Sequence, residues 1–245
     1  MNNHTYAQDK PGFVFIHGAG LNSEIWSKVL EGLGHPYLLI DFPNRGIQKG
    51  VDKELALADY VMHIKKQIDE WDIRRVIIVA HSLGGVLSLK LAAGLHDRLA
   101  GFAAVGAVIP KKDGSFLSVL PLPKRILMSL ILRKMGTRPP EAAIRAGLCN
   151  DLTEEQAAMI IKKFTPESVR VYTDRAVAPA PAVPKLYVKL SKDKELSPSM
   201  QDKMISHFAP HAVESLETGH LPMLSDPDGL RRLLQNFIAL VESAY

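Results

Sequence analysis

The chain of 245 residues is long enough for one large α/β domain or two small ones, and its 47% hydrophobic content excludes a disordered protein. A single cysteine, Cys149, excludes a disulfide scaffold. The formal net charge of +4, from 30 basic and 26 acidic residues, is too diffuse to indicate nucleic-acid binding, and no aromatic and basic RNA-binding motif is present.

No secretory signal or membrane-spanning segment is expected. Residues 1–12 are polar, and the most apolar stretches, residues 101–109 and 126–132, are far shorter than the roughly 20 residues that a spanning helix needs. We therefore expect a cytoplasmic protein that does not insert stably into a membrane.

The first half of the chain alternates short apolar runs with helical patterns, which is typical of parallel β/α units. The sequence predicts strands at residues 13–16, 37–40, 76–80 and 99–109, and helices at residues 23–33, 53–71 and 84–95. In the helix at 53–71 the apolar residues recur at steps of three and four, the spacing of one helix face. The run at 76–80 is apolar throughout, as expected for a central strand covered on both faces.

The alternation stops between residues 110 and 184, which are rich in proline and read as helix or loop. It resumes with a strand at 186–190, a helix at 199–208, a strand at 212–216 and a final amphipathic helix at 226–243. We therefore expect residues 1–109 and 181–245 to form one α/β core. Residues 110–180 are expected to form a helical cap inserted between two strands of its sheet.

The six residues 80–85, AHSLGG, have the pattern of a nucleophile elbow with Ala80 in place of the first glycine. A sharp turn from strand to helix leaves room only for small side chains two residues before and two after the serine, and Ala80 and Gly84 satisfy that demand. Such a turn would present the Ser82 hydroxyl at a helix N-terminus, where free amides favour negative charge. The plainer interpretation is that Ser82 caps this helix, because serine is a preferred N-cap.

A serine hydroxyl needs a base, and the base needs an orienting acid; with an elbow of this kind the chain order is Ser, Asp or Glu, then His. His220 follows the last predicted strand and is the expected base. Asp193 follows the strand at 186–190 and is the preferred acid, with Glu195 and Asp113 as alternatives.

Residues 17–20, HGAG, follow the first predicted strand and supply small side chains where a loop must bring a backbone amide close to a substrate carbonyl. We assign one oxyanion amide to Ala19 and the other to Leu83, the residue after the serine. His17 is expected to support this loop rather than react. His207 and His211 flank a proline and lack metal-protease spacing, so a zinc site is not expected there. A serine mechanism of this kind implies no metal or organic cofactor.

These features resemble the α/β-hydrolase superfamily over nearly the whole chain: residues 17–20, the elbow at Ser82, Asp193, and Gly219 with His220. Residues 185–188 and 150–174 are similar to the branch that contains methylesterases, hydroxynitrile lyases and their bacterial esterase relatives. The resemblance implies a reduced six-stranded parallel sheet with a helical cap, because few residues precede the first strand. It also implies a serine hydrolase that cleaves carboxylic esters through an acyl-enzyme.

Two departures bear on the reaction. The lyases of this branch carry a threonine and a lysine where this sequence has Gly18 and Leu221, which disfavours lyase activity. Dehalogenases and epoxide hydrolases of the superfamily have an aspartate at the position of Ser82. A non-catalytic receptor for a small apolar ligand, and a cofactor-free perhydrolase, remain as alternatives.

The predicted cap carries the positive charge, with 12 basic and 7 acidic residues for a net of +5, whereas the remaining 18 basic and 19 acidic residues give −1. We interpret this excess, in decreasing order of preference, as a solvated helix face, a docking site for an anionic partner such as an acidic carrier protein, or a contact with an anionic membrane surface. The interleaved apolar residues predict either an apolar site for the small-molecule ester or, for most of them, packing of the cap onto the sheet. They are Leu117, Val119, Leu120, Ile126, Leu127, Met128, Leu130, Ile131 and Met135.

Overall fold

The computed structural model describes residues 10–43, 45, 54–176 and 178–244. Within these residues, six strands form one parallel sheet in the order β2-β1-β3-β4-β5-β6, which confirms the predicted fold class. The strands are β1 (Gly12–Ile16), β2 (Tyr37–Ile40), β3 (Val76–His81), β4 (Leu99–Val105), β5 (Lys185–Leu190) and β6 (Ala212–Leu216).

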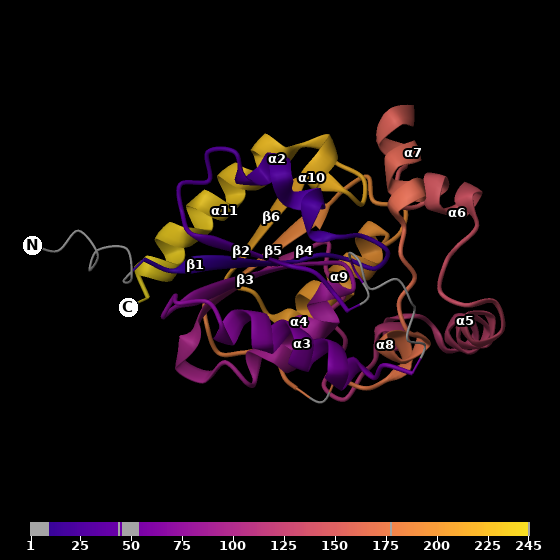
Figure 1. Cartoon of the computed structure of the whole chain (residues 1–245), viewed down its shortest axis with the longest axis horizontal. Coiled ribbons are helices and arrows are strands. Elements are labelled where there is room, and N and C mark those ends of the chain that lie inside the picture. The colour runs from indigo at the N-terminus through magenta and orange to yellow at the C-terminus, as the bar shows by residue number, and fades with distance from the viewer. Residues whose placement is uncertain (1–9, 44, 46–53, 177, 245) are drawn as a thin grey trace, which may run out of the picture.

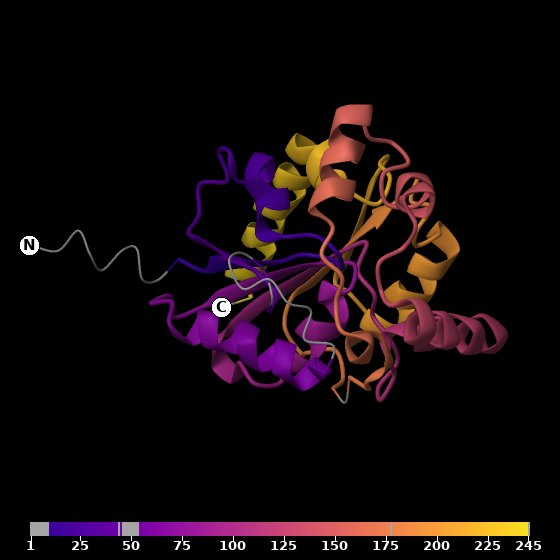
Figure 2. The ribbon, with the colours of Figure 1, turned by 45° about the vertical axis from the view of Figure 1, so that its right-hand side comes forward.

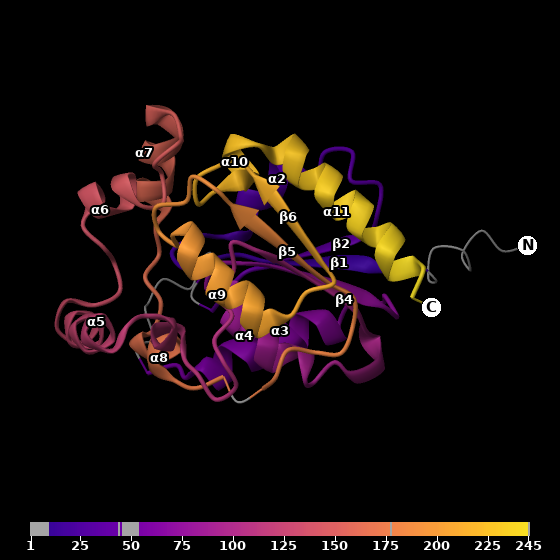
Figure 3. The same ribbon diagram turned by 180° about the vertical axis from the view of Figure 1, so that it is seen from behind.

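Helices cover both faces of the sheet (Figure 1). One face carries the 3₁₀ turn η1 (Ser23–Trp26) with α2 (Ser27–Leu30), α10 (Pro222–Ser225) and α11 (Pro227–Glu242). The other carries α3 (Leu57–Asp69), α4 (Gly84–Ala92) and α9 (Pro198–Phe208), and Figure 3 shows α9 from behind. A short 3₁₀ turn, η2 (His96–Arg98), leads into β4.

The alternation of side chains along each strand divides the core into two layers. On β1, Val14 and Ile16 pack in the layer under α3 and α4, whereas Phe13 and Phe15 pack in the layer under α2 and α11. All four side chains are fully buried. Strands buried on both faces explain why the predicted runs are apolar throughout.

Several predicted elements are longer than the observed ones; α3 and α4, for example, end at Asp69 and Ala92 rather than at residues 71 and 95. The helix expected at 23–33 is only η1 and α2, because Gly32 adopts a φ of +77° and ends it before Gly34. The strand expected at 99–109 ends at Val105, because Gly106 turns to a φ of +47°.

Between β4 and β5 the chain leaves the sheet for residues 110–180, called the cap segment below. It contains η3 (Phe116–Val119), α5 (Leu122–Met135), α6 (Glu141–Ala146), α7 (Glu154–Lys163) and α8 (Val169–Thr173). The helices gather at one end of the molecule (Figures 1 and 2). Thr165 forms an antiparallel bridge with Gly20, which places the segment beside the loop that follows β1.

The expectation that most apolar residues of the cap segment pack onto the sheet is wrong for α5. No residue of α5 is buried, and seven of its eight large apolar side chains are exposed, from 37% at Ile131 up to 74% at Met135. The helix projects from the body of the molecule (Figure 2), and Leu132 is its one large apolar side chain that packs against the core. The exposed residues are Leu122, Ile126, Leu127, Met128, Leu130, Ile131 and Met135.

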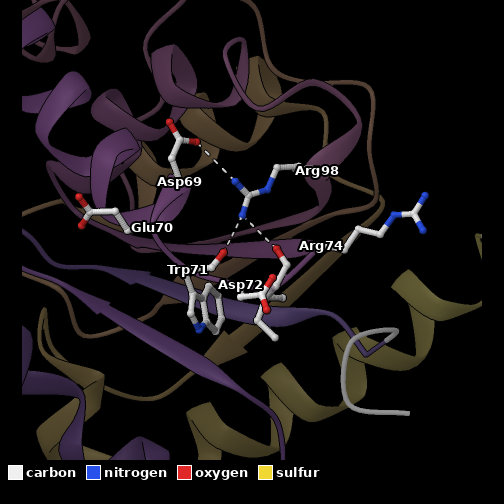
Figure 4. A pocket seen from close by; sticks show the side chains of 7 residues that line it. Asp69, Glu70, Trp71, Asp72, Arg74 and Arg98 are labelled. Carbon is white, nitrogen blue, oxygen red and sulfur yellow. Dashed lines mark hydrogen bonds and ion pairs between the residues drawn. The ribbon is translucent and has the colours of Figure 1, made fainter. Parts of the chain in front are cut away.

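A hollow of about 550 Å³ lies at the amino-terminal edge of the sheet, between residues 69–74 and Arg98 (Figure 4). Arg98 donates hydrogen bonds to the carbonyls of Ile68, Trp71 and Ile73, so its guanidinium closes the end of α3. We therefore interpret the hollow as part of the packing between Arg98 and the end of α3, not as a ligand site. In the described part of the chain, no helix is both long enough and apolar enough to cross a membrane.

Candidate active site

Four loops at the carboxyl ends of parallel strands carry the residues singled out in the sequence. Ala19 follows β1, Ser82 follows β3, Asp193 follows β5 and His220 follows β6. The strand order reverses between β1 and β3, and such a switch point is where open α/β sheets bind ligands. Ala19 and Ser82 lie on the two sides of this point.

Ser82 occupies a strained turn between β3 and α4. Its φ is +49°, in the left-handed region that non-glycine residues rarely adopt. The backbone carbonyl of Ser82 accepts hydrogen bonds from the N–H groups of Gly85, at 3.0 Å, and Val108, at 2.9 Å. The N-cap of α4 is Leu83, and no side-chain capping bond is made there, so the plainer interpretation of Ser82 as a capping residue is wrong.

Two glycines allow the neighbouring loops to reach this turn. A β-carbon at Gly84 would lie 2.8 Å from the carbonyl oxygen of Ile16, and one at Gly18 would lie 2.9 Å from Cβ of Ser82. Both distances are shorter than real β-carbons tolerate. The loop after β1 therefore packs directly against Ser82, and Gly18 and Gly84 make the contact possible.

His220 and Asp193 form a buried pair. His220 Nδ1 lies 2.8 Å from Asp193 Oδ2, and neither side chain is exposed. The other oxygen, Oδ1, accepts hydrogen bonds from the N–H groups of Glu195 and Leu196. The two alternative acids, Glu195 and Asp113, are exposed, and neither forms this bond.

Gln201 holds the turn that presents Asp193. This side chain is fully buried on α9; its amide nitrogen donates to the carbonyls of Leu190 and Leu196, and its oxygen accepts from the N–H of Leu190. The bonds span both ends of the turn. Asp193 is thus fixed from outside its own loop.

Charge around His220 favours its protonated form. Burial by itself would lower the pKa of His220, but attraction and hydrogen bonding by Asp193, with smaller contributions from Glu195 and Asp151, raise this pKa above its ordinary value. His81 lies with its ring centroid 4.7 Å from that of His220, and its Nε2 lies 2.8 Å from the His220 carbonyl oxygen. Burial, followed by the proximity of His220, lowers the pKa of His81, so His81 remains neutral.

The Nε2 atom of His220 is buried and has no hydrogen-bond partner among the described residues. Because Nδ1 donates to Asp193, Nε2 carries the lone pair that can accept a proton. The structure contains no hydrogen bond between Ser82 and His220. Such bonds are often loose without substrate and tighten when substrate binds.

Two backbone N–H groups beside Ser82 are free to donate. In the described ranges, neither the N–H of Ala19 nor that of Leu83 forms a hydrogen bond, although the N–H groups of Gly20, next to Ala19, and of Gly85, two residues after Leu83, do. Free amides beside a nucleophile can stabilise a developing oxyanion.

His17 supports the loop after β1. Its ring is fully buried and packs at a tilt of 40° against Phe42 with centroids 3.9 Å apart, and Nδ1 lies 2.8 Å from the carbonyl oxygen of Gly18. Burial and the positive charge of Arg45 lower the pKa of His17 to about 3. The neutral ring therefore makes no true ion pair with Asp41, whose Oδ1 is 3.7 Å from Nε2.

The cap segment hydrogen-bonds to the loop after β1 through residues that the sequence analysis did not identify. The N–H of Gly20 donates to Glu167, and the carbonyl of Gly20 accepts from the N–H of Thr165. Glu167 also binds the Arg45 guanidinium and the Tyr60 hydroxyl. Burial raises the pKa of Glu167, and the charge of Arg45 opposes that shift.

The cap segment also hydrogen-bonds to the loops that carry His220 and Asp193. The N–H of Gly219 donates to the Asp151 carboxylate, and the Asn150 amide donates to the carbonyl of Lys192. A β-carbon at Gly219 would lie 2.4 Å from Asp151 Oδ1. Asp151 and Glu167 lie 68 and 147 residues from the glycines that they bind, so no local sequence pattern could have revealed these contacts.

An apolar groove of about 410 Å³ runs beside Gly20, between η1 and α7. Its apolar lining consists of Leu21, Ile25, Met159, Ile160 and Leu224. Across the residues described, no group of three or more His, Cys, Asp and Glu side chains is arranged to hold a metal ion.

The sequence profile of the alpha/beta hydrolase family matches residues 13–233. The chain therefore belongs to the alpha/beta hydrolase family. Methylesterase 17 of Arabidopsis thaliana is 25% identical over 252 residues, covering 91% of this chain and 90% of the relative.

Two solved structures share the fold. An extracellular alpha/beta-hydrolase from a Paenibacillus species superimposes with a TM-score of 0.83 at 18% identity, over 92% of this chain and 98% of the other. That hydrolase is described as sharing structural and functional homology with tobacco salicylic acid binding protein 2. The methylesterase MES16 of Arabidopsis gives a TM-score of 0.78 at 21% identity, over 94% of this chain and 99% of the other.

Proposed function

We propose that the protein is a serine hydrolase of carboxylic esters, with Ser82 as nucleophile, His220 as base and Asp193 as the orienting acid. The observation that carries this proposal is the buried His220–Asp193 pair, whose open Nε2 atom lies at the same sheet edge as a serine held at a φ of +49°. A serine that only stabilised a turn would need neither feature. Similarity to methylesterases supports the ester as substrate.

In the proposed reaction, His220 Nε2 takes the proton of the Ser82 hydroxyl while Oγ attacks the ester carbonyl carbon. The N–H groups of Ala19 and Leu83 stabilise the resulting oxyanion. The protonated His220, stabilised by Asp193, gives its proton to the departing alcohol and leaves an acyl-enzyme. Water, deprotonated by His220, then releases the carboxylic acid and restores Ser82. These steps use side chains and backbone amides of this chain.

The contacts of the cap segment suggest how the substrate site is covered. We propose that residues 110–180 act as a cap over the substrate site, because they hydrogen-bond to the loops of both Gly20 and Gly219.

Lyase activity is disfavoured by the space around position 18. A β-carbon there would lie 2.8 Å from Nδ1 of His81, so the threonine of the related lyases does not fit this backbone. The position of their lysine holds Leu221, which is fully buried.

Labelling with a fluorophosphonate tests the proposed nucleophile. We expect the wild-type protein to be labelled at Ser82, as located by peptide mass spectrometry, and to hydrolyse aryl esters of acetic to octanoic acid. Ser82→Ala should lose both properties. Ser88→Ala is the matched control, because Ser88 is a buried serine on the next helix whose hydroxyl has no partner in the described structure. Ester hydrolysis that survives in Ser82→Ala would rule the mechanism out and leave the receptor interpretation.

A further inference from the structure

The helix α5 exposes large apolar side chains around most of its circumference. Ile126, Leu127 and Leu130 are 55%, 59% and 54% exposed, whereas Ser129 and Leu132 are its two less exposed residues. A helix that served only the fold would turn its apolar side to the core and its serine to the solvent. In α5 Leu132 packs against the core, but the other seven large apolar side chains are exposed, so they are available to a partner.

The charges of α5 are all positive. Lys124 and Arg125 lie near its start, Arg133 and Lys134 lie in its last turn, and the helix contains no acidic residue. Cations near a helix start oppose the helix dipole, so the first pair does not serve the stability of α5. None of the four forms an ion pair with a residue that the structure describes.

A basic pocket of about 650 Å³ adjoins the start of α5, and Arg125 belongs to both. Asp113 is the one carboxylate among the described residues of its lining, which also includes the hydroxyls of Ser115 and Ser118. Five cations that form no ion pair with a described residue therefore surround a hollow with room for a phosphate group and its ester substituents. They are Lys111, Lys112, Arg125, Arg175 and Lys203.

We propose that α5 and the basic pocket form a docking surface for an anionic lipid membrane. The apolar side chains of α5 enter the boundary between headgroups and acyl chains, the cations at both helix ends reach back to the headgroups, and the pocket holds a lipid phosphate. The 14 residues of α5 span about 21 Å, less than the hydrocarbon core of about 30 Å, so the helix lies along the membrane surface.

The shape and charge of α5 favour lipid over a protein partner. The helix projects from the body of the molecule (Figure 2), and a projecting helix can enter a soft planar surface without a matching groove. A second copy of the chain would bring two sets of four cations together. A protein groove would need carboxylates at both ends of α5, whereas anionic headgroups surround an inserted helix on all sides.

Vesicle flotation with the full chain tests this docking surface. We expect binding to vesicles of phosphatidylcholine with about one third phosphatidylserine, no binding to phosphatidylcholine alone, and release at high salt. Arg133→Gln with Lys134→Gln should weaken binding by more than tenfold, since each cation near an anionic surface contributes about fivefold. Leu127→Ser with Leu130→Ser should weaken it at least tenfold.

The matched control is Met62→Ser with Lys66→Gln on α3, which removes an equally exposed apolar side chain and a cation elsewhere; it should bind as the wild type does. Three results would overturn the proposal: equal binding to both vesicle types, equal loss in the control, or no vesicle binding at all. Binding to soluble polyglutamate without vesicle binding would identify an acidic protein as the partner. Self-association in sedimentation that the α5 substitutions abolish, again without vesicle binding, would identify a second copy.

Discussion

The conformation of Ser82 stores free energy at the reactive position. A left-handed backbone costs a non-glycine residue about 1–2 kcal/mol, and Ser82 keeps a φ of +49° because hydrogen bonds from Gly85 and Val108 fix its carbonyl. Such strain is typical of sites where a side chain must be presented in one direction. The strain has a measurable consequence for stability.

We predict that Ser82→Gly is more stable than Ser82→Ala by about 0.5–1 kcal/mol, because glycine adopts a positive φ without a steric penalty but loses more chain entropy on folding. Urea unfolding of the two variants measures the difference. Both should be inactive toward esters. Equal stability of the two variants would mean that the backbone at Ser82 is not strained.

The charge on His220 predicts the pH dependence of hydrolysis. The reaction needs neutral His220, and the pKa of His220 is raised above its ordinary value of 6.5. The midpoint of the acidic limb of the kcat/KM profile should therefore lie above pH 6.5. Asp193→Asn removes the principal carboxylate, and burial should then move the limb to lower pH while kcat falls by about a thousandfold or more.

Glu195→Gln is the control for Asp193→Asn. It removes a more distant carboxylate that contributes less to the pKa of His220, so the limb should move in the same direction by a smaller amount. A limb that moves equally in both variants would contradict the assignment of Asp193 as the partner of His220. The shift is read from initial rates with one aryl ester across the pH range.

At the scale of elements, strands and loops could be predicted from sequence because apolar runs and their following turns are local signals. The predicted strand at 37–40 and the position of Asp193 just after β5 illustrate this. The contacts of Glu167 and Asp151 could not be predicted, since each joins residues far apart in the chain. The exposure of α5 could not be predicted either, because an apolar helix is normally buried and the sequence does not show which element would pack on it.

The close approach of the cap segment to Gly219 gives a prediction for that loop. In Gly219→Ala the new β-carbon would meet Asp151 Oδ1 at 2.4 Å, so we expect a loss of about 1–3 kcal/mol in stability and a lower kcat as His220 shifts. Gly94→Ala is the control, since its β-carbon would find no atom closer than 3.5 Å. Thermal unfolding and ester turnover of both variants test this, and equal behaviour would contradict the contact.

For the molecule as a whole, stability resides in the sheet and the helices that cover it, and α5 contributes little. Leu127→Ser with Leu130→Ser should change the free energy of unfolding by no more than about 0.5 kcal/mol, because both side chains are exposed. Leu234→Ala on α11 should cost about 2–5 kcal/mol, because Leu234 is fully buried. Urea unfolding compares them, and a large loss in the α5 variant would mean that these leucines are packed.

The hydrogen bonds between the cap segment and the loops of the sheet determine how the chain should unfold. Its residues lie between β4 and β5 in sequence, yet they hydrogen-bond to loops that follow β1, β5 and β6. Removing the segment from the sheet would break contacts with loops after three strands at once. Most of its helices are too short to be stable in isolation. The segment and the sheet should therefore melt together in one cooperative transition rather than as two separate units.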